Sequence, residues 1–256
     1  MNVRCETCWL GELWSLLAQA EDWDGRAFEA SYASASDGDL ICTVRKVKKG
    51  TVLAANEAED EKVYGVCEGV LARQHFLSDG RRSLVELFLP GEIAALGNTT
   101  DNMQFVALTP CELVVFPLQL LEKARRSSER VDCLYFNHLE RQANQVLEHC
   151  ADISRKTPPE RLASFLLEYR DRAKALHVAS SGEEAAGFDD KEYRLPLRGR
   201  EVGDYLALES ETVSRCYSRL AESFAAKLNG GNTVRILNEE KLREIAEGGL
   251  PRRKKN

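Results

Sequence analysis

The residues with the clearest chemical potential lie near the C-terminal end of the chain. Four polar residues recur there at i, i+3, i+4 and i+7, which places them on one face of a helix: Glu211, Ser214, Arg215 and Ser218. Arginine can donate two hydrogen bonds to guanine, and glutamate can accept one from the amino group of cytosine. This face has the side chains of a helix that reads bases in the major groove, although the same spacing also suits a solvated helix with one Glu–Arg pair.

Apolar residues around this face predict the elements that must position it, two short helices joined by a tight turn. The first helix has an apolar side formed by Val202, Leu206 and Leu208. Ser210 precedes the second helix, in which apolar residues recur at spacings of four and three: Val213, Tyr217 and Leu220. We therefore expect one face of the second helix to be buried and the polar face to be open.

The stretch 200–220 resembles the helix-turn-helix of the CRP/FNR family of bacterial transcriptional regulators, and its E-x-x-S-R motif is that of the FNR-like branch. This resemblance implies a homodimer that binds double-stranded DNA sequence-specifically, with RNA polymerase as a further partner. It also implies a TTGAT-N4-ATCAA-like inverted repeat as the target. In that site we assign Arg215 to the guanine, Glu211 to the paired cytosine and Ser214 to the neighbouring thymine.

Composition and charge agree with a soluble regulator. The chain has 256 residues, of which 43% are hydrophobic and 30% charged, and its net charge is −6. Residues 191–256 carry 14 Lys and Arg against 10 Asp and Glu, so the basic part contains the predicted reading helix. The sequence shows neither a run of about 18 apolar residues nor the features of a signal peptide, so we expect a cytoplasmic protein without a membrane partner.

Residues 38–117 have the short alternating segments and turn signals of a β-rich domain. Strands are predicted at Val63–Cys67, Val70–Leu77 and Ser83–Leu89, with a hairpin turn at Asp79–Gly80. The segment resembles the β-roll sensor domain of the same family. Cyclic AMP is not expected, because Asp101 follows Gly91–Glu92 where the cyclic-nucleotide-binding members need a basic residue; Glu92 is interpreted as structural.

A long helix is predicted over 128–155. Along it, apolar residues are spaced three, four, three, four and three apart, as in a coiled-coil seam: Phe136, Leu139, Ala143, Val146, Cys150 and Ile153. A seam on a single helix needs a partner, and a two-fold copy of the same helix is the simplest one. Packing against the chain's own β-roll is the alternative, and it can coexist with a dimer if it uses the other side of the helix.

Taken together, these patterns predict an α+β protein. Its N-terminal β-roll would resemble a cyclic-nucleotide-binding jelly roll, followed by a dimerisation helix and a C-terminal winged helix-turn-helix. Val234–Leu237 after a Gly-rich turn predicts the wing, from which Lys227 and Arg235 are expected to contact phosphates. The expected domains are an N-terminal segment with a cysteine pair, the β-roll, the helix and the DNA-binding domain, at 1–30, 31–127, 128–156 and 157–256.

Eight cysteines add a redox question. The FNR-like branch normally has three cluster-ligating cysteines near the N-terminus and a fourth in the sensor domain, whereas only Cys5 and Cys8 precede Cys42 here. A four-iron four-sulfur cluster completed by Cys67 or Cys111, a redox-active thiol pair and inert thiols all stay open, so the cofactor is undetermined. Cys216, next to Arg215, is either a redox sensor or a buried thiol.

The residues show no catalytic constellation, and the four histidines are scattered without zinc-ligand spacing, so an enzyme is not expected. The sequence favours a DNA-binding regulator that responds to oxygen or redox state. The competing interpretation is a cysteine-based redox or metal-binding protein whose helices only mediate protein contacts.

Overall fold

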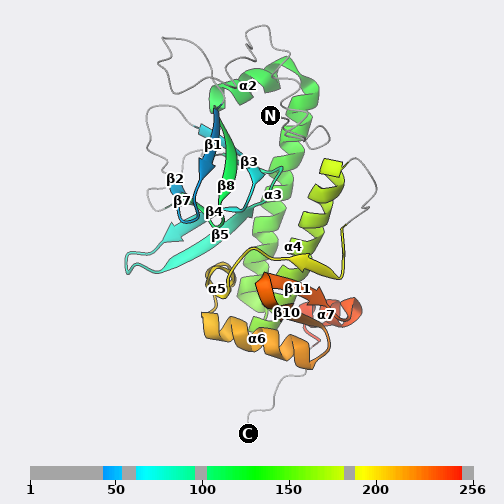
Figure 1. Ribbon diagram of the computed structural model, residues 1–256. Helices are drawn as coiled ribbons and strands as arrows, with labels where there is room; N and C mark the ends of the chain where they lie inside the picture. The colour runs from blue at the N-terminus through cyan, green and yellow to red at the C-terminus, as the bar shows by residue number, and fades with distance from the viewer. Residues whose placement is uncertain (1–42, 54–61, 96–102, 182–187, 250–256) are drawn as a thin grey trace. The chain divides into compact units, whose positions relative to one another are not determined.

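A computed structural model describes residues 43–53, 62–95, 103–181 and 188–249. The chain divides into two compact units, and the division falls within one long helix, between Ala143 and Asn144. The first unit contains the strand-rich part and the second contains the C-terminal helices (Figure 1). None of the helices in the described ranges combines the length and the apolar content that crossing a bilayer requires.

The first unit consists of two four-stranded antiparallel sheets. One sheet has the order β1-β8-β3-β6, formed by Thr43–Val47, Cys111–Pro117, Lys62–Glu68 and Ile93–Ala95. The other has the order β2-β7-β4-β5, formed by Val52–Leu53, Met103–Ala107, Leu71–Phe76 and Arg82–Phe88. The three strands predicted from alternation correspond to β3, β4 and β5, and the α+β class with an N-terminal β-roll is confirmed.

Both sheets contribute to one apolar cluster. It includes Tyr64 of β3, Phe88 of β5 and Phe105 of β7, which are at most 1% exposed. The ring of Phe105 makes edge-on contacts with the other two rings, at centroid distances of 5.9 and 5.5 Å. Because alternate residues of each strand point to opposite faces, this cluster accounts for one face of each sheet.

The other face of the β1-β8-β3-β6 sheet is covered by helices. Val63, Ile93 and Val114 pack there with α2 (Leu118–Ser127) and with Val131 at the start of α3 (Glu129–Arg155). Further along α3, the His138 ring lies 3.3 Å from the Ile93 carbonyl oxygen, and the Gln142 amide donates to the same oxygen at 2.9 Å. One side of α3 therefore belongs to the core of the first unit.

Two turns of the β-roll agree with the sequence-based expectations. The amide of Leu77 donates to the Arg81 carbonyl at 2.9 Å across the predicted hairpin turn, where Gly80 has φ +84°. In the Pro90–Gly91 turn, the Leu89 amide donates to the Glu92 carboxylate at 2.8 Å. That carboxylate thus stabilises its own turn, as the structural interpretation of Glu92 requires.

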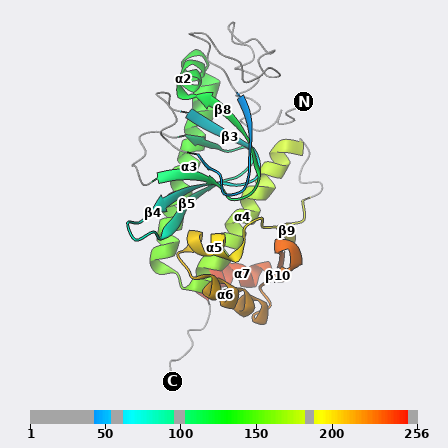
Figure 2. The same ribbon diagram turned by 60° about the vertical axis from the view of Figure 1, so that its left-hand side comes forward.

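The second unit contains the end of α3 and a compact set of helices around a three-stranded sheet (Figure 2). The sheet has the order β10-β11-β9, formed by Ala226–Asn229, Thr233–Ile236 and Glu192–Arg194. A short 3-10 turn, η2 (Gly230–Asn232), joins β10 to β11 as the predicted wing. The helices are α4 (Pro158–Ser181), α5 (Gly199–Leu206), α6 (Ser210–Glu222) and α7 (Glu239–Ala246).

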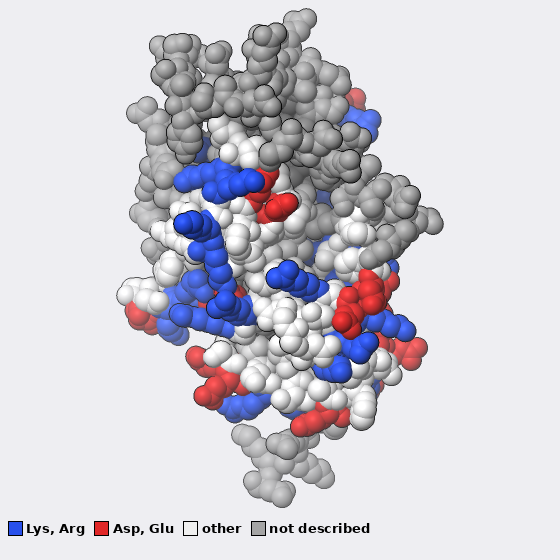
Figure 3. Space-filling model, in the orientation of Figure 1, with Lys and Arg blue, Asp and Glu red and all other residues white. Residues whose placement is uncertain are grey.

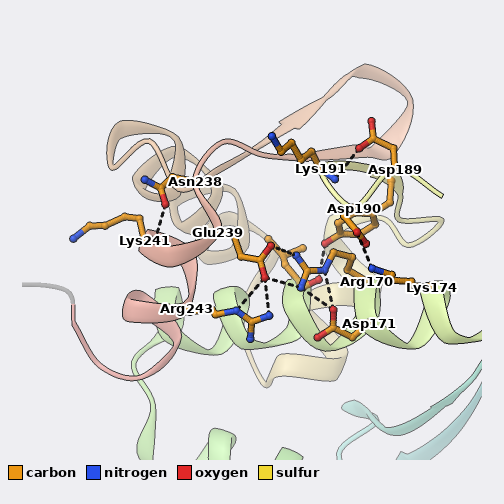
Figure 4. Close-up of polar contacts among 12 residues, drawn as sticks. Arg170, Asp171, Lys174, Asp189, Asp190, Lys191, Asn238, Glu239, Lys241 and Arg243 are labelled. Carbon is orange, nitrogen blue, oxygen red and sulfur yellow. Dashed lines mark hydrogen bonds and ion pairs between the residues drawn. The ribbon is translucent and has the colours of Figure 1, made fainter. Parts of the chain in front are cut away.

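Ion pairs between charged side chains connect α7 to α4 (Figure 4). The guanidinium group of Arg170, whose side chain is only 4% exposed, lies 2.9 Å from the Glu239 carboxylate and 2.7 Å from Asp171. Arg243 donates to the same Glu239 at 2.7 Å. The hydrogen bonds from Arg170 and Arg243 lower the pKa of Glu239 to about 2, so the carboxylate stays ionised at neutral pH.

Candidate nucleic-acid interface

The predicted pair of short helices is present as α5 and α6. The Arg198 amide donates to the Glu201 carboxylate at 2.6 Å and so helps to define the start of α5. At the other end, Ala207 adopts the left-handed conformation with φ +55°, and α6 begins three residues later. Leu208, which we expected on the first helix, lies in this turn because α5 already ends at Leu206.

A close backbone approach at Gly203 determines how the turn packs on α5. The Leu208 amide donates to the Gly203 carbonyl at 2.9 Å. A Cβ atom on Gly203 would lie 2.4 Å from the Leu208 carbonyl oxygen and 3.6 Å from Val213 of α6. Because a Cβ atom cannot approach a backbone oxygen this closely, position 203 requires glycine. The close packing at this glycine connects α5 to the turn and to the start of α6.

The two faces of α6 differ as predicted. Its apolar residues are buried: Val213, Cys216, Tyr217 and Leu220. The opposite face is exposed and contains all four candidate reading residues: Glu211, Ser214, Arg215 and Ser218. Arg215 and Glu211 form an ion pair of 3.1 Å whose side chains are 72% and 84% exposed. Both charged groups are therefore on the surface of the helix. When DNA binds, each group can replace its ion-pair partner by a donor or an acceptor on a base edge.

A cleft lies between α6, the start of α5 and β10 of the wing. Its volume is about 370 Å³, and its lining combines three serines with a lysine and apolar side chains: Gly199, Ser210, Val213, Ser214, Tyr217, Ser218, Ala221, Lys227 and Leu228. Hydroxyl groups and an ammonium group are suited to phosphate and sugar oxygens. The cleft therefore joins the wing residue Lys227 to the exposed face of α6.

The two basic wing residues have different surroundings. Arg235 of β11 forms an ion pair of 2.9 Å with Glu192 of β9, whereas Lys227 lines the cleft. In the view of Figure 3, Lys and Arg side chains gather on the left of the upper part, whereas near the lower end they are interspersed with Asp and Glu. Because Arg235 is engaged by a carboxylate and Lys227 lines the cleft, the two wing residues differ in what they offer to a phosphate.

The apolar stripe predicted on α3 is largely open to solvent. Phe136 and Leu139 are 65% and 40% exposed, Ala143 and Cys150 are also exposed, and Val146 and Ile153 are half-buried. Leu147, which the 3-4 spacing left out, is 67% exposed. An α-helix advances 100° per residue, and this places Leu147 closer than Val146 to the line through Phe136 and Ala143. That angular test could have identified Leu147 from the sequence.

The cysteines of the described part do not gather at one place. Cys67 packs in the cluster under α2 and α3, whereas Cys111 lies in the cluster between the sheets. Since the two residues are in the cores on opposite faces of one sheet, they cannot both complete the same iron–sulfur cluster. Cys5 and Cys8 lie outside the described residues. Within those ranges, no group of three His, Cys, Asp or Glu side chains is arranged to hold a metal ion.

Burial makes the described candidate thiols weak nucleophiles. It raises the pKa of Cys67, with a further contribution from Glu112, to about 11. It also raises the pKa of Cys111, and the pKa of Cys216 despite the opposing effect of Arg219 and Arg215. Because the thiolate is the reactive form, these three residues are poorly suited to redox sensing at neutral pH.

Comparisons with known proteins agree with this architecture. A Crp-like helix-turn-helix domain matches residues 160–245, and a cyclic nucleotide-binding domain matches residues 44–128. The nitrogen fixation regulation protein FixK of Bradyrhizobium diazoefficiens is 28% identical over 77% of this chain and 79% of its own length. The transcriptional activator protein FnrA of Stutzerimonas stutzeri is 26% identical over 83% of this chain and 84% of its own.

Solved structures show the same fold. FixK2 from Bradyrhizobium japonicum is 28% identical, with a TM-score of 0.67 over 80% of this chain and 98% of its own. A CooA mutant from Carboxydothermus hydrogenoformans, 14% identical, has a TM-score of 0.62 over 90% of this chain and 94% of its own. These matches define a DNA-binding transcriptional regulator, since the family they share is one of regulators and not of enzymes. The chain belongs to the CRP/FNR family and is of the FNR/FixK type.

Proposed function

We propose that this regulator acts as a homodimer on a TTGAT-N4-ATCAA-like inverted repeat. The observation that carries the proposal is the exposed Glu211–Arg215 pair near the N-terminal end of α6. Arg215 donates to the guanine of each half-site, Glu211 accepts from the paired cytosine, and Ser214 contacts the neighbouring thymine. Ser218 and Lys227 adjoin this face in the cleft and contact the DNA backbone.

The apolar stripe of α3 supports the homodimer. A 27-residue helix with Phe136 and Leu147 about two-thirds exposed has a long apolar surface that a second copy can cover. A two-fold axis beside this helix pairs the stripe of one copy with the same stripe of the other copy. It also supplies two copies of α6, as an inverted repeat requires. We further propose RNA polymerase as a partner and a cytoplasmic location, and the family membership supports both.

We assign the response to oxygen or redox state to Cys5 and Cys8. Of the five cysteines considered as ligands or sensors, Cys111 and Cys216 are buried, Cys67 is half-buried, and all three have raised pKa values, which leaves the N-terminal pair. Anaerobic purification followed by iron and sulfide assays and an absorption spectrum distinguishes a cluster from a thiol pair. Chains without iron whose DNA binding is insensitive to oxidants would contradict the assignment.

The target sequence is tested by selection from random DNA at a stated salt concentration, since affinity for DNA depends strongly on salt. Enrichment of a TTGAT-like inverted repeat is the expected result. Enrichment of unrelated sequences would show that the exposed face of α6 reads other bases. Retention of all sequences alike would favour the alternative, in which the helices mediate protein contacts.

A further inference from the structure

In the second unit, a ring stack connects the end of α3 to the first helix of the reading pair. The His149 imidazole, in a residue 8% exposed, stacks on the Tyr205 ring of α5 at a centroid distance of 4.0 Å and an interplanar angle of 14°. Phe165 of α4 packs against the same tyrosine ring at 5.4 Å. Tyr205 is therefore held between α3 and α4, and its position depends on the His149 ring.

A polar shell surrounds this stack. Arg161 of α4 donates to the Lys156 carbonyl at 2.9 Å and to the Leu206 carbonyl at 3.2 Å, so one guanidinium group contacts the ends of both α3 and α5. The Lys156 ammonium group lies 2.6 Å from Asp152 and donates to Ser164 at 2.7 Å. We call His149, Asp152, Lys156, Arg161 and Tyr205 together the α3–α5 joint.

The joint favours a neutral imidazole. Burial lowers the pKa of His149, and the nearby Arg161 guanidinium lowers it further. Asp152 of the same helix and a hydrogen bond with the Tyr205 backbone act in the opposite direction, but the Asp152 carboxylate is already paired with Lys156. Protonation would therefore place a buried cation beside the Arg161 guanidinium group, while the nearest carboxylate, that of Asp152, is already engaged by Lys156.

We propose that His149 is a positioning residue for DNA reading, whose neutral ring keeps α5 seated on the end of α3 and whose protonation releases α5. The proposal rests on the DNA-binding function assigned to α6. The link from α5 to α6 is the tight contact at Gly203, where the turn before α6 leaves no room for a Cβ atom. A displacement of Tyr205 is thereby passed to Arg215 and its neighbours without any contact between His149 and DNA.

The direction of the pH effect follows from the lowered pKa. Above about pH 6.5, the ordinary histidine pKa, the ring is neutral in both the seated and the released state, so the seated state has its full stability. As the pH falls below that value, the released state takes up a proton first, and the seated state loses stability until its own lower pKa is passed. DNA affinity should decline by up to about tenfold per pH unit and per subunit in this window.

The test measures binding of the full chain to a labelled TTGAT-N4-ATCAA duplex by fluorescence anisotropy, between about pH 8 and pH 5 at constant ionic strength. His149→Phe retains a flat ring that cannot take up a proton, and His149→Gln removes the ring and the titration together. Both variants should bind independently of pH in this window, with His149→Gln weaker throughout. His138→Phe, which changes a buried histidine of the first unit, should retain the parent's pH dependence.

A second measurement does not depend on the target sequence. Imidazole resonances of the free protein, assigned with the same variants, should show a His149 pKa below the ordinary value of about 6.5. An ordinary or raised pKa, a pH-independent parent, or unchanged pH dependence in His149→Phe would each overturn the proposal. If the parent does not bind the duplex even at the highest pH, the proposed target is wrong. The resonance titration then tests separately whether His149 in the α3–α5 joint has the lowered pKa that the proposal requires.

Discussion

The exposed faces of α3 and α6 present opposite chemistry. On α3 the exposed stripe includes Phe136 and Leu147, 65% and 67% exposed, whereas on α6 the exposed face has the ionised pair Glu211–Arg215. An apolar stripe is stabilised when another apolar surface removes it from water. A charged face instead has to replace its bound water by other polar groups. The comparison supports the two proposals made above, that α3 binds a second copy of the chain and that α6 binds DNA.

Charges in the α3 stripe should have the largest effect on DNA binding. In Phe136→Glu with Leu147→Glu, four carboxylates per dimer would face an apolar seam, so we expect a monomer in sedimentation experiments. Loss of the second half-site contact should reduce DNA affinity by about 10²–10⁴-fold. Arg141→Glu places a carboxylate at an exposed position away from the stripe by reversing an existing charge, and it should leave the dimer intact. A double variant that sediments as a dimer would show that α3 has another role.

Removal of the reading arginine should have the next largest effect. Arg215→Ala deletes the donor pair for guanine and should cost about 1–3 kcal/mol per half-site, with loss of preference at the G·C pair. Competition binding with substituted half-sites measures both quantities. Unchanged preference at that base pair would show that Arg215 only forms its ion pair with Glu211 on the helix surface.

The wing lysine should have a smaller and less selective effect. Lys227→Ala removes a phosphate contact, so it should weaken binding to all sequences alike and reduce the salt slope by about one per subunit. Arg235→Ala is the matched comparison, and it should change the slope less because Arg235 is already paired with Glu192 at 2.9 Å. A selective loss in Lys227→Ala would place this lysine at a base edge.

The smallest expected change is in stability, at the C-terminal end of α6. The Phe224 amide donates to the Ala221 carbonyl and the Ala225 amide to the Leu220 carbonyl, the Schellman arrangement in which glycine is preferred. Phe224 occupies this position at φ +55° with 76% of its surface exposed. Phe224→Gly should raise the free energy of unfolding by about 1 kcal/mol in denaturant titrations.

Phe224→Ala is the control for that experiment, because alanine removes the ring and retains a Cβ atom in the left-handed region. Its stability should stay close to that of the parent. Equal gains in both variants would assign the effect to the exposed ring and not to the backbone. A loss of DNA affinity in either variant would extend the reading surface to the end of α6, which the comparison of the two helices does not predict.

The polar face of α6 could be predicted from the sequence because helical spacing is a local property. Residues at i, i+3, i+4 and i+7 share a face wherever the helix is packed, and the apolar residues between them identify the buried side. The same reasoning placed the stripe on α3 and the strands and hairpin turn of the β-roll. For α3 it missed Leu147, since a strict 3-4 repeat departs from the true angular position of residues along a straight helix.

Only the tertiary structure decided how distant residues combine. Cys67 and Cys111 are both candidate cluster ligands in the sequence, yet they lie in separate cores on opposite faces of one sheet. The Arg235–Glu192 pair and the stack of His149 on Tyr205 join residues more than 40 positions apart. Spacing along the chain determines which residues share a helix face or alternate along a strand, whereas contacts between elements depend on the packing of whole elements, which no local period contains.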